Sequence, residues 1–421
     1  MQMVGRAEAQ RRTLRTLMFT QVLGGVGLAA GATVGSLLAE RISGRTDLAG
    51  LGGTFQTLGA ALLALPIATV AHRAGRRPSL TLAYVVAALG ALGIVAAAAT
   101  RSFALFLLGS AALGAASAAN SAARYAAADL ALPAHRGRDL SLVVWVTTLG
   151  SVLGPNLAGP AEPIARALGL DVLAGPFVVS AVVLMLGAVA ITALLRPDPL
   201  LLSRQLSGEE AAPRKGSLGR GVAALRRHPE ASQGVAIMAL GHAVMVGVMV
   251  MTPLHLVHGH ASLAIVGFVI SGHIFGMFAF APIWGIGVDR FGAPYVALAG
   301  GAILLISAVL AGLSAAGFSV LLTIALFLLG LGWSAAFISG STLLVGPLTV
   351  TERPAGQGLA DLGMGLTAAI CGAAAGVIVQ HWGYAWLAHV ALVGAFTIMA
   401  IAAMAATASA RAAEAPVDRP V

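Results

Sequence analysis

The sequence predicts an all-α membrane protein with twelve transmembrane helices arranged as two six-helix bundles. Three observations lead to this fold class. Hydrophobic residues make up 58% of the 421 residues and charged residues only 10%, whereas an ordinary soluble chain carries roughly 25% charged residues. Apolar runs close to the roughly 20 residues that a helix needs to cross a bilayer recur along the chain. A loop pattern of the first half is also repeated in the second half.

The spans are expected to be helices, because membrane strands would alternate apolar and polar residues over about ten positions, and these runs do not. In the first half the predicted spans are 16–38, 48–70, 79–98, 103–125, 141–160 and 173–195. In the second half they are 232–256, 263–286, 294–314, 318–345, 357–379 and 384–406. We therefore expect an N-terminal bundle over 1–195, a charged cytoplasmic linker over 196–231, and a C-terminal bundle with a short cytoplasmic tail over 232–421.

Basic residues indicate how these spans are oriented. All but four of the 25 Lys and Arg residues fall on one side of the predicted spans, the four being Arg41, Arg45, Arg101 and Arg166. Because cytoplasmic loops carry the excess of Lys and Arg, this asymmetry places both termini in the cytoplasm. The expected location is the inner (cytoplasmic) membrane of the cell, which the chain would cross many times.

Several classes of function are disfavoured. The net charge of +9 follows from topology rather than from nucleic-acid binding. Neither a Walker-type phosphate loop nor an HExxH zinc spacing occurs in the sequence, so we expect no enzyme, no cofactor and energy from a gradient rather than ATP. The expected partners are a small-molecule or metal-ion substrate and the lipid bilayer, and the chain is expected to act as a monomer.

One loop signature identifies a family resemblance. Residues 285–292 read GIGVDRFG, and Gly285, Asp289, Arg290 and Gly292 resemble the loop signature of the major facilitator superfamily. Glycine permits the tight turn, and the acid and base can pin neighbouring helix ends in one of two conformations. The resemblance covers nearly the whole chain and implies the major facilitator fold, transport by alternating access, and a gating role for this loop.

The first half holds a degenerate copy of the same loop. Residues 68–75 read ATVAHRAG, so Arg73 and Gly75 are kept while Ala68 and His72 replace the expected glycine and acid. Arg73 and Gly75 are therefore also gating candidates. Whether this half has a charge clamp, or only basic topology anchors, is left open by the sequence.

The fifth predicted span contains the segment GSVLGPNLAG. It resembles a motif common in facilitators that exchange drugs for protons. Small residues four apart let helices pack closely, and a proline inside a helix bends it by removing a hydrogen bond. Gly154 and Pro155 are thus candidates for the gating motion, with helix packing alone as the alternative. Ser110 stands where the proton-coupled pattern has arginine.

Methionine and histidine cluster in the seventh and eighth predicted spans. Met245 and Met249 lie four apart on one predicted helix face, and His273 and Met277 do so on the next. Thioether and imidazole groups are soft ligands that suit copper. The spacing resembles the paired motifs of CcoA-like bacterial copper importers, which implies that these four residues handle the metal. Packing is the alternative, because methionine is a common apolar filler.

Four neighbouring residues are candidates for collecting metal at the outer mouth: Met251, His255, His258 and His260.

Asp361 is a carboxylate placed clearly inside a predicted span. Such a group is a functional candidate by default, here as a carrier of a coupling proton or as a partner of Arg124 in a cytoplasmic gate. A residue that only snorkels to the surface is the alternative.

The sequence therefore predicts a secondary transporter, with copper import as the first substrate hypothesis and proton-coupled efflux of small organic compounds or drugs as the second. A non-transporting membrane sensor is disfavoured by the short loops.

Overall fold

The computed structural model describes residues 2–131, 136–207, 218–348 and 352–414, and it is built from helices. This outcome follows from the bilayer, where every backbone polar group needs a partner within the chain. The first bundle contains these helices: α1 (Gln2–Ser43), η1 (Thr46–Leu48), α2 (Leu51–Ala74), α3 (Arg76–Thr100), α4 (Phe103–Leu113), α5 (Ala115–Asp129), α6 (Arg136–Asn156), α7 (Glu162–Ala167), η3 (Val172–Ala174) and α8 (Gly175–Leu194).

The second bundle repeats this arrangement with small differences. Its helices are α11 (Pro229–His258), α12 (Leu263–Phe278), α13 (Ala281–Phe291), α14 (Ala293–Leu313), α15 (Val320–Val345), α16 (Arg353–Trp382) and α17 (Tyr384–Glu414). Two predicted spans are each divided into two helices: the fourth at Gly114 and the eighth at Ala279 and Phe280. Gly114 is needed there because a Cβ would lie 2.2 Å from the backbone oxygen of Gln56 on α2.

The predicted fold class is confirmed. Eleven helices of the described residues are long and apolar enough to cross a membrane. The remaining predicted span, the fifth (141–160), corresponds to α6, a helix of 21 residues whose polar residues leave it outside this group. It packs along α1 inside the first bundle, and it also contacts α12 of the second.

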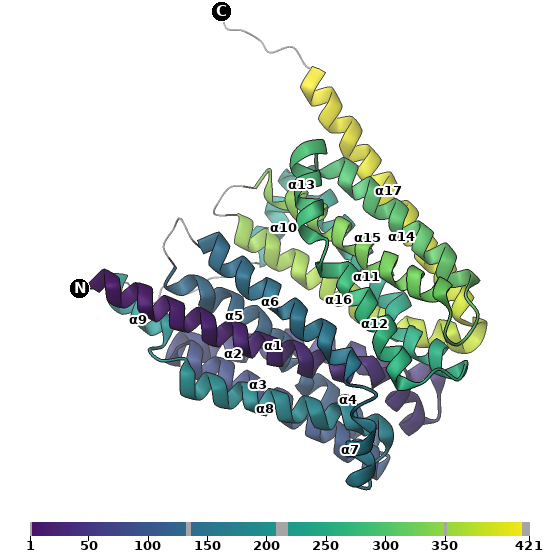
Figure 1. Cartoon of the computed structure of the whole chain (residues 1–421). Coiled ribbons are helices and arrows are strands. Elements are labelled where there is room, and N and C mark those ends of the chain that lie inside the picture. The colour runs from purple at the N-terminus through teal and green to yellow at the C-terminus, as the bar shows by residue number, and fades with distance from the viewer. Residues whose placement is uncertain (1, 132–135, 208–217, 349–351, 415–421) are drawn as a thin grey trace, which may run out of the picture.

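The two bundles meet mainly at one end of the molecule, which we call the closed end (Figure 1). There α2 packs on α16, η1 on α16, and α6 on α12. Thr54 donates a hydrogen bond to the Ala369 carbonyl at 2.9 Å, and His258 lies 3.1 Å from the carboxylate of Glu40. The start of α1 and the end of α17 lie toward the opposite end, which we call the linker end (Figure 1).

Two short helices lie in the region expected to be a linker between the bundles. Helix α9 (Pro199–Ser207) packs on α1, α3 and α5, whereas α10 (Leu218–Arg227) packs on α11 and α16. Residues 208–217 of the expected linker lie outside the described residues. Each short helix therefore associates with the bundle nearest to it in sequence.

Candidate functional site

A cavity of about 320 Å³ lies between the two bundles. The first bundle lines it with residues of α1, α2, α3, α4, α6 and α8, and the second with residues of α11, α12 and α16. Phe106, Phe177 and Phe278 contribute aromatic rings, and none of the described lining residues is charged. Ligand sites are typically clefts of roughly 300–1,000 Å³ with apolar walls and few polar groups, so this cavity is the candidate substrate site.

Three of the polar side chains that line this cavity have hydrogen-bonding capacity left for a ligand. The hydroxyl of Ser36 on α1 is buried without a partner. The Gln56 side chain on α2 also lines the cavity, and it forms no hydrogen bond within the described part of the chain. Unmet polar groups beside an apolar cavity provide directional contacts for a ligand.

The third polar group, His242 on α11, is held by its neighbour on α15. The indole Nε1–H of Trp333 donates to Nδ1 of His242 at 3.1 Å. In a neutral imidazole that accepts at Nδ1, the proton is on Nε2, which can then donate. Trp333 is itself fixed by stacking on Phe337, with ring centroids 5.1 Å apart. His242 is therefore an oriented donor at the cavity wall.

The four predicted metal-handling residues are not gathered at one point. Met245, Met249 and Met277 line the cavity, but His273 is not among the lining residues. Its ring is fully buried, and Nδ1 lies 2.8 Å from the carbonyl oxygen of Leu326 on α15. Spacing of four residues places His273 and Met277 near each other on α12, but the imidazole is turned toward α15 instead of the cavity.

Three of the four candidates for a metal-collecting mouth are engaged elsewhere. Met251 is fully buried, His255 stacks on Tyr384 with ring centroids 4.1 Å apart, and His258 pairs with Glu40. The fourth, His260, is exposed. Within the described residues, no group of three or more His, Cys, Asp or Glu side chains is placed to hold a metal ion.

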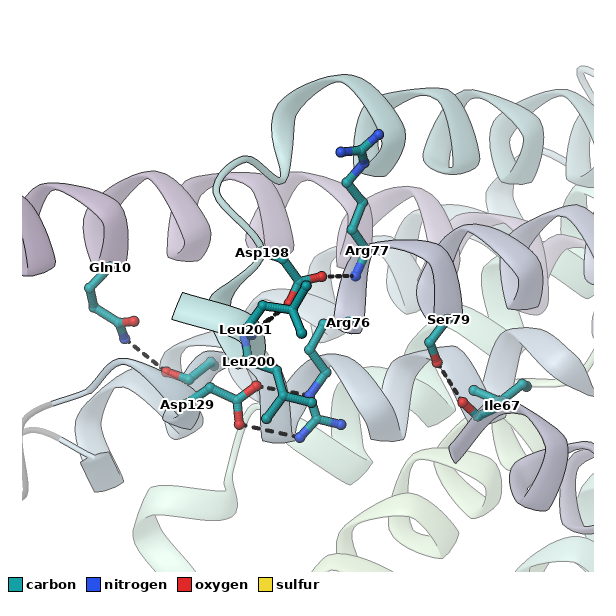
Figure 2. A network of polar contacts seen from close by, with 10 residues as sticks. Gln10, Ile67, Arg76, Arg77, Ser79, Asp129, Asp198, Leu200 and Leu201 are labelled. Atoms are coloured by element: carbon teal, nitrogen blue, oxygen red, sulfur yellow. Dashed lines mark hydrogen bonds and ion pairs between the residues drawn. The ribbon is translucent and has the colours of Figure 1, made fainter. Parts of the chain in front are cut away.

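A polar network lies directly after the degenerate loop of the first half, at the start of α3 (Figure 2). Arg76 forms two hydrogen bonds with Asp129, at 2.8 and 3.2 Å, which join the start of α3 to the end of α5. Asp198 accepts from the backbone N–H of Arg77 at 2.7 Å, and from the N–H groups of Leu200 and Leu201. The two acids of this network therefore come from distant parts of the sequence.

Gly75 of this loop is required for two reasons. Its φ of +99° is a conformation that side chains with a Cβ rarely adopt, and a Cβ would lie 2.5 Å from the Asp198 carboxylate. Arg73, two residues earlier, is exposed. The side chain of His72 lies outside the described residues.

The intact loop of the second half is more open. Asp289 and Arg290 are exposed, and Arg290 lies over the ring of Phe291, 5.9 Å from its centroid. Asp289 forms no ion pair within the described residues. Gly292 has a φ of +93°, and a Cβ on Gly285 would meet nothing within 4 Å. The better sequence match therefore makes fewer contacts in this conformation.

The glycine–proline segment of α6 lies at two helix contacts. A Cβ on Gly154 would come within 2.8 Å of Ala29 and Val26 on α1, inside the first bundle. Pro155 approaches the second bundle, where its carbonyl oxygen would lie 2.2 Å from a Cβ on Gly267. One residue on, the Asn156 amide donates to the Ser271 hydroxyl at 2.6 Å.

Asp361 on α16 and Arg124 on α5 belong to opposite bundles. Asp361 is exposed, and Arg124 interacts with it electrostatically without forming an ion pair in contact. The Arg124 guanidinium instead donates to the Ser121 hydroxyl at 3.0 Å.

Comparison with known proteins identifies the class to which this architecture belongs. The model of the Major Facilitator Superfamily matches residues 17–261 and 234–421, so the chain belongs to this superfamily of membrane transporters. Among solved structures, a bacterial homologue of the human lysosomal transporter Spinster, inward-facing and unoccupied, shares the fold with a TM-score of 0.70. Its sequence is 15% identical, and the match covers 94% of this chain and 96% of that one. The nucleoside transporter NupG gives a TM-score of 0.62 at 16% identity, over 93% and 98% of the two chains.

Particular relatives are nearer in sequence. YdeG of Bacillus subtilis, an uncharacterized MFS-type transporter, is 37% identical over 89% of this chain and 87% of its own. The riboflavin transporter RfnT of Brucella anthropi is 30% identical over 90% of this chain and 92% of its own.

Proposed function

We propose that this transporter carries an uncharged organic compound with an aromatic ring system, by alternating access at the cavity between the bundles. The observation that supports this most is the lining: a mostly apolar wall, with three phenylalanines and three methionines, surrounds a few neutral polar groups, and no described lining residue is charged. An ionic substrate would lose its hydration there without gaining a counter-charge, which is costly. A neutral ring that bears hydrogen-bond acceptors and donors could pack against the apolar side chains and also bond to the polar groups.

The similarity to RfnT suggests the first compound to test. That relative is named a riboflavin transporter, and riboflavin combines a fused ring system with several acceptors and hydroxyl groups. In the proposed complex, His242 donates to a ring acceptor, while Gln56 and Ser36 bind from the opposite bundle. We infer a flavin or a similarly sized neutral heterocycle as the substrate class.

Copper uptake is the second candidate, and one observation favours it: three methionine sulfurs line the same cavity. The two candidate functions differ in whether transport needs the thioether sulfur. Met249→Leu removes a thioether and keeps the apolar volume, so it should leave transport of an organic compound within about twofold and abolish transport through a thioether copper site.

The test is transport of labelled riboflavin, and separately of Cu(I), by the purified protein in liposomes. Measuring uptake and release, with and without a proton gradient, also decides between import and proton-coupled export. His242→Leu and Gln56→Leu should each weaken apparent affinity for the heterocycle about two- to tenfold, the worth of one hydrogen bond. Copper transport that is lost in Met249→Leu, with no transport of neutral heterocycles, would overturn the proposal.

We further propose that the linker end faces the cytoplasm, as the basic residues indicate, so that this conformation is open to the inside. The variant Leu168→Cys in a Cys371→Ala background places the one thiol at the closed end, and it should then react with an impermeant maleimide added to whole cells.

Asp361 and Arg124 are proposed to pair when the linker end closes, because they come from opposite bundles and already attract each other. Each single charge reversal, Arg124→Asp or Asp361→Arg, should impair transport, and the double reversal should restore part of it. Failure of the double variant to recover any activity would contradict the pairing.

A further inference from the structure

A second pocket, of about 540 Å³, lies on the linker-end surface of the first bundle and is separate from the central cavity. Three arginines of α1, Arg11, Arg12 and Arg15, line it together with Phe19 and with Leu194 at the end of α8. Helices α1 and α8 pack against each other along their length, so the pocket lies where their linker ends meet.

The pocket is on the face of α1 that points away from the bundle. The opposite face is held by α5, where Arg6 donates to the Leu130 carbonyl at 3.0 Å and Gln10 to the Ala127 carbonyl at 2.8 Å. At 100° per residue, Arg11 and Arg15 lie on roughly the other side of the helix. Both are exposed in the structure. The outward face is the one that meets lipid and headgroups in a membrane.

Along this face of α1, charged side chains are followed by apolar ones, as headgroups are followed by acyl chains in a bilayer. Phe19 is 54% exposed and Leu194 is 44% exposed. Phe19 lies four residues after Arg15, about 6 Å further toward the membrane centre at 1.5 Å per residue. A guanidinium layer thus lies directly above an apolar layer, which matches the boundary between phospholipid headgroups and acyl chains.

The three guanidinium groups have no partner within the part of the chain that the structure describes. There, the side chains of Arg11, Arg12 and Arg15 form neither an ion pair nor a hydrogen bond. The one acid lining the pocket is Glu8. Clustered like charges favour an anionic ligand, and arginine binds phosphate through two parallel hydrogen bonds.

We propose that this pocket binds the headgroup of an anionic phospholipid, with the phosphate on the arginines and an acyl chain along Phe19 and Leu194. A role in orienting the chain during insertion explains basic residues on this side. It does not require a concave site or an exposed aromatic ring beneath the charges. A phospholipid accounts for the charges, the hollow and the apolar floor together.

The experiment is native mass spectrometry of the full-length protein, titrated with dioleoyl phosphatidylglycerol or with dioleoyl phosphatidylcholine. Each arginine near a membrane surface contributes roughly fivefold to binding of anionic lipid. The double variant Arg11→Gln, Arg15→Gln should therefore bind phosphatidylglycerol about 30-fold more weakly, with phosphatidylcholine binding unchanged. Glu8→Gln removes the opposing charge and should strengthen phosphatidylglycerol binding severalfold.

Arg226→Gln, at an exposed position of α10, is the control because it removes a linker-end arginine outside the pocket. It should leave both lipids' binding unchanged. Excess inorganic phosphate should not displace the bound lipid, because the acyl chain contributes to binding. The proposal is overturned if Glu8→Gln has no effect, if the double variant binds phosphatidylglycerol like the wild type, or if Arg226→Gln loses binding equally. The Glu8→Gln result decides the matter even where the double variant fails to fold.

Discussion

Gly267 on α12 is the point where a single added methyl group should shift the balance between conformations. A Cβ there would lie 2.2 Å from the Pro155 carbonyl oxygen, 3.0 Å from its carbon and 3.4 Å from the Asn156 Cα, all in the opposite bundle. These are backbone atoms, so no rotamer change relieves the overlap. Restoring ordinary contact distances requires α12 and α6 to separate by about 1 Å.

Overpacking of this kind costs about 1–3 kcal/mol. Because the contact joins the two bundles at the closed end, we expect that cost in this conformation and not in the alternative one, where the closed end opens. Gly267→Ala should therefore favour the alternative conformation by roughly 5- to 150-fold. Gly50→Ala, where a Cβ would lie 1.8 Å from the Gly372 carbonyl oxygen on α16, should act in the same direction.

The measurement is a distance distribution between spin labels at Leu168 and Phe318, which are 58% and 52% exposed in loops of opposite bundles. Longer distances should become dominant in Gly267→Ala. Gly247→Ala is the control, since a Cβ there meets nothing within 4 Å and the change is also in a helix interior. An unchanged distribution in Gly267→Ala, or the same change in Gly247→Ala, would refute the reasoning.

Three further predictions concern the ion pairs. Arg76→Gln should lower the free energy of unfolding by about 2 kcal/mol, and by more than Asp129→Asn, because it leaves a buried carboxylate unpaired; thermal unfolding in detergent compares them. Burial raises the pKa of Asp129, although Arg76 acts in the opposite direction, so the Asp129 carboxyl holds its proton more tightly in the folded state than in the unfolded state. The Asp129 contribution to stability should then fall as pH rises from about 4 through that raised pKa, and Asp129→Asn should remove this part of the pH dependence of Tm; an unaltered profile would contradict it. Glu40→Gln breaks the pair between Glu40, whose side chain is 23% exposed, and His258, which is 49% exposed. In the spin-label measurement it should raise the ratio of the alternative conformation to the present one by at most about fivefold.

Hydropathy was sufficient to predict the helices because the bilayer imposes a simple rule, that a span is long, apolar and helical. The interruptions at Gly114 and Phe280 were not predicted. Gly114 lies in an alanine-rich segment, and its importance comes from the close approach of α2, which sequence spacing does not encode. The helices α9 and α10 were also missed, since short polar helices resemble linker sequence.

The candidate site was predicted only in part. Helical spacing placed Met245 and Met249 on one face, and both line the cavity. It did not show that the His273 ring turns toward α15, because that depends on the position of the Leu326 carbonyl, 53 residues away. Ser36 and Gln56 gave no clear signal, since neutral polar residues in spans usually bond between helices.

The polar network after the first-half loop shows a second limit of sequence spacing. His72 stands where the family pattern has an acid, so the sequence alone does not show which acids the neighbouring arginines meet. Asp129 bonds the Arg76 side chain and Asp198 the Arg77 backbone, and Asp198 lies 121 residues from Arg77. Only the folded chain brings these groups to the loop.

The hydrogen bond from Trp333 to His242 has a thermodynamic consequence for the transport cycle, because it fixes His242 to the second bundle. Ser36 and Gln56 belong to the first bundle. A bound molecule that contacts His242, Ser36 and Gln56 therefore bridges two bundles that move relative to each other. Its free energy of binding then depends on their separation. A substrate held best at an intermediate separation lowers the energy of the state midway between the two open forms, as an enzyme lowers that of a transition state. The free protein lacks this bridge and should interconvert more slowly than the loaded one.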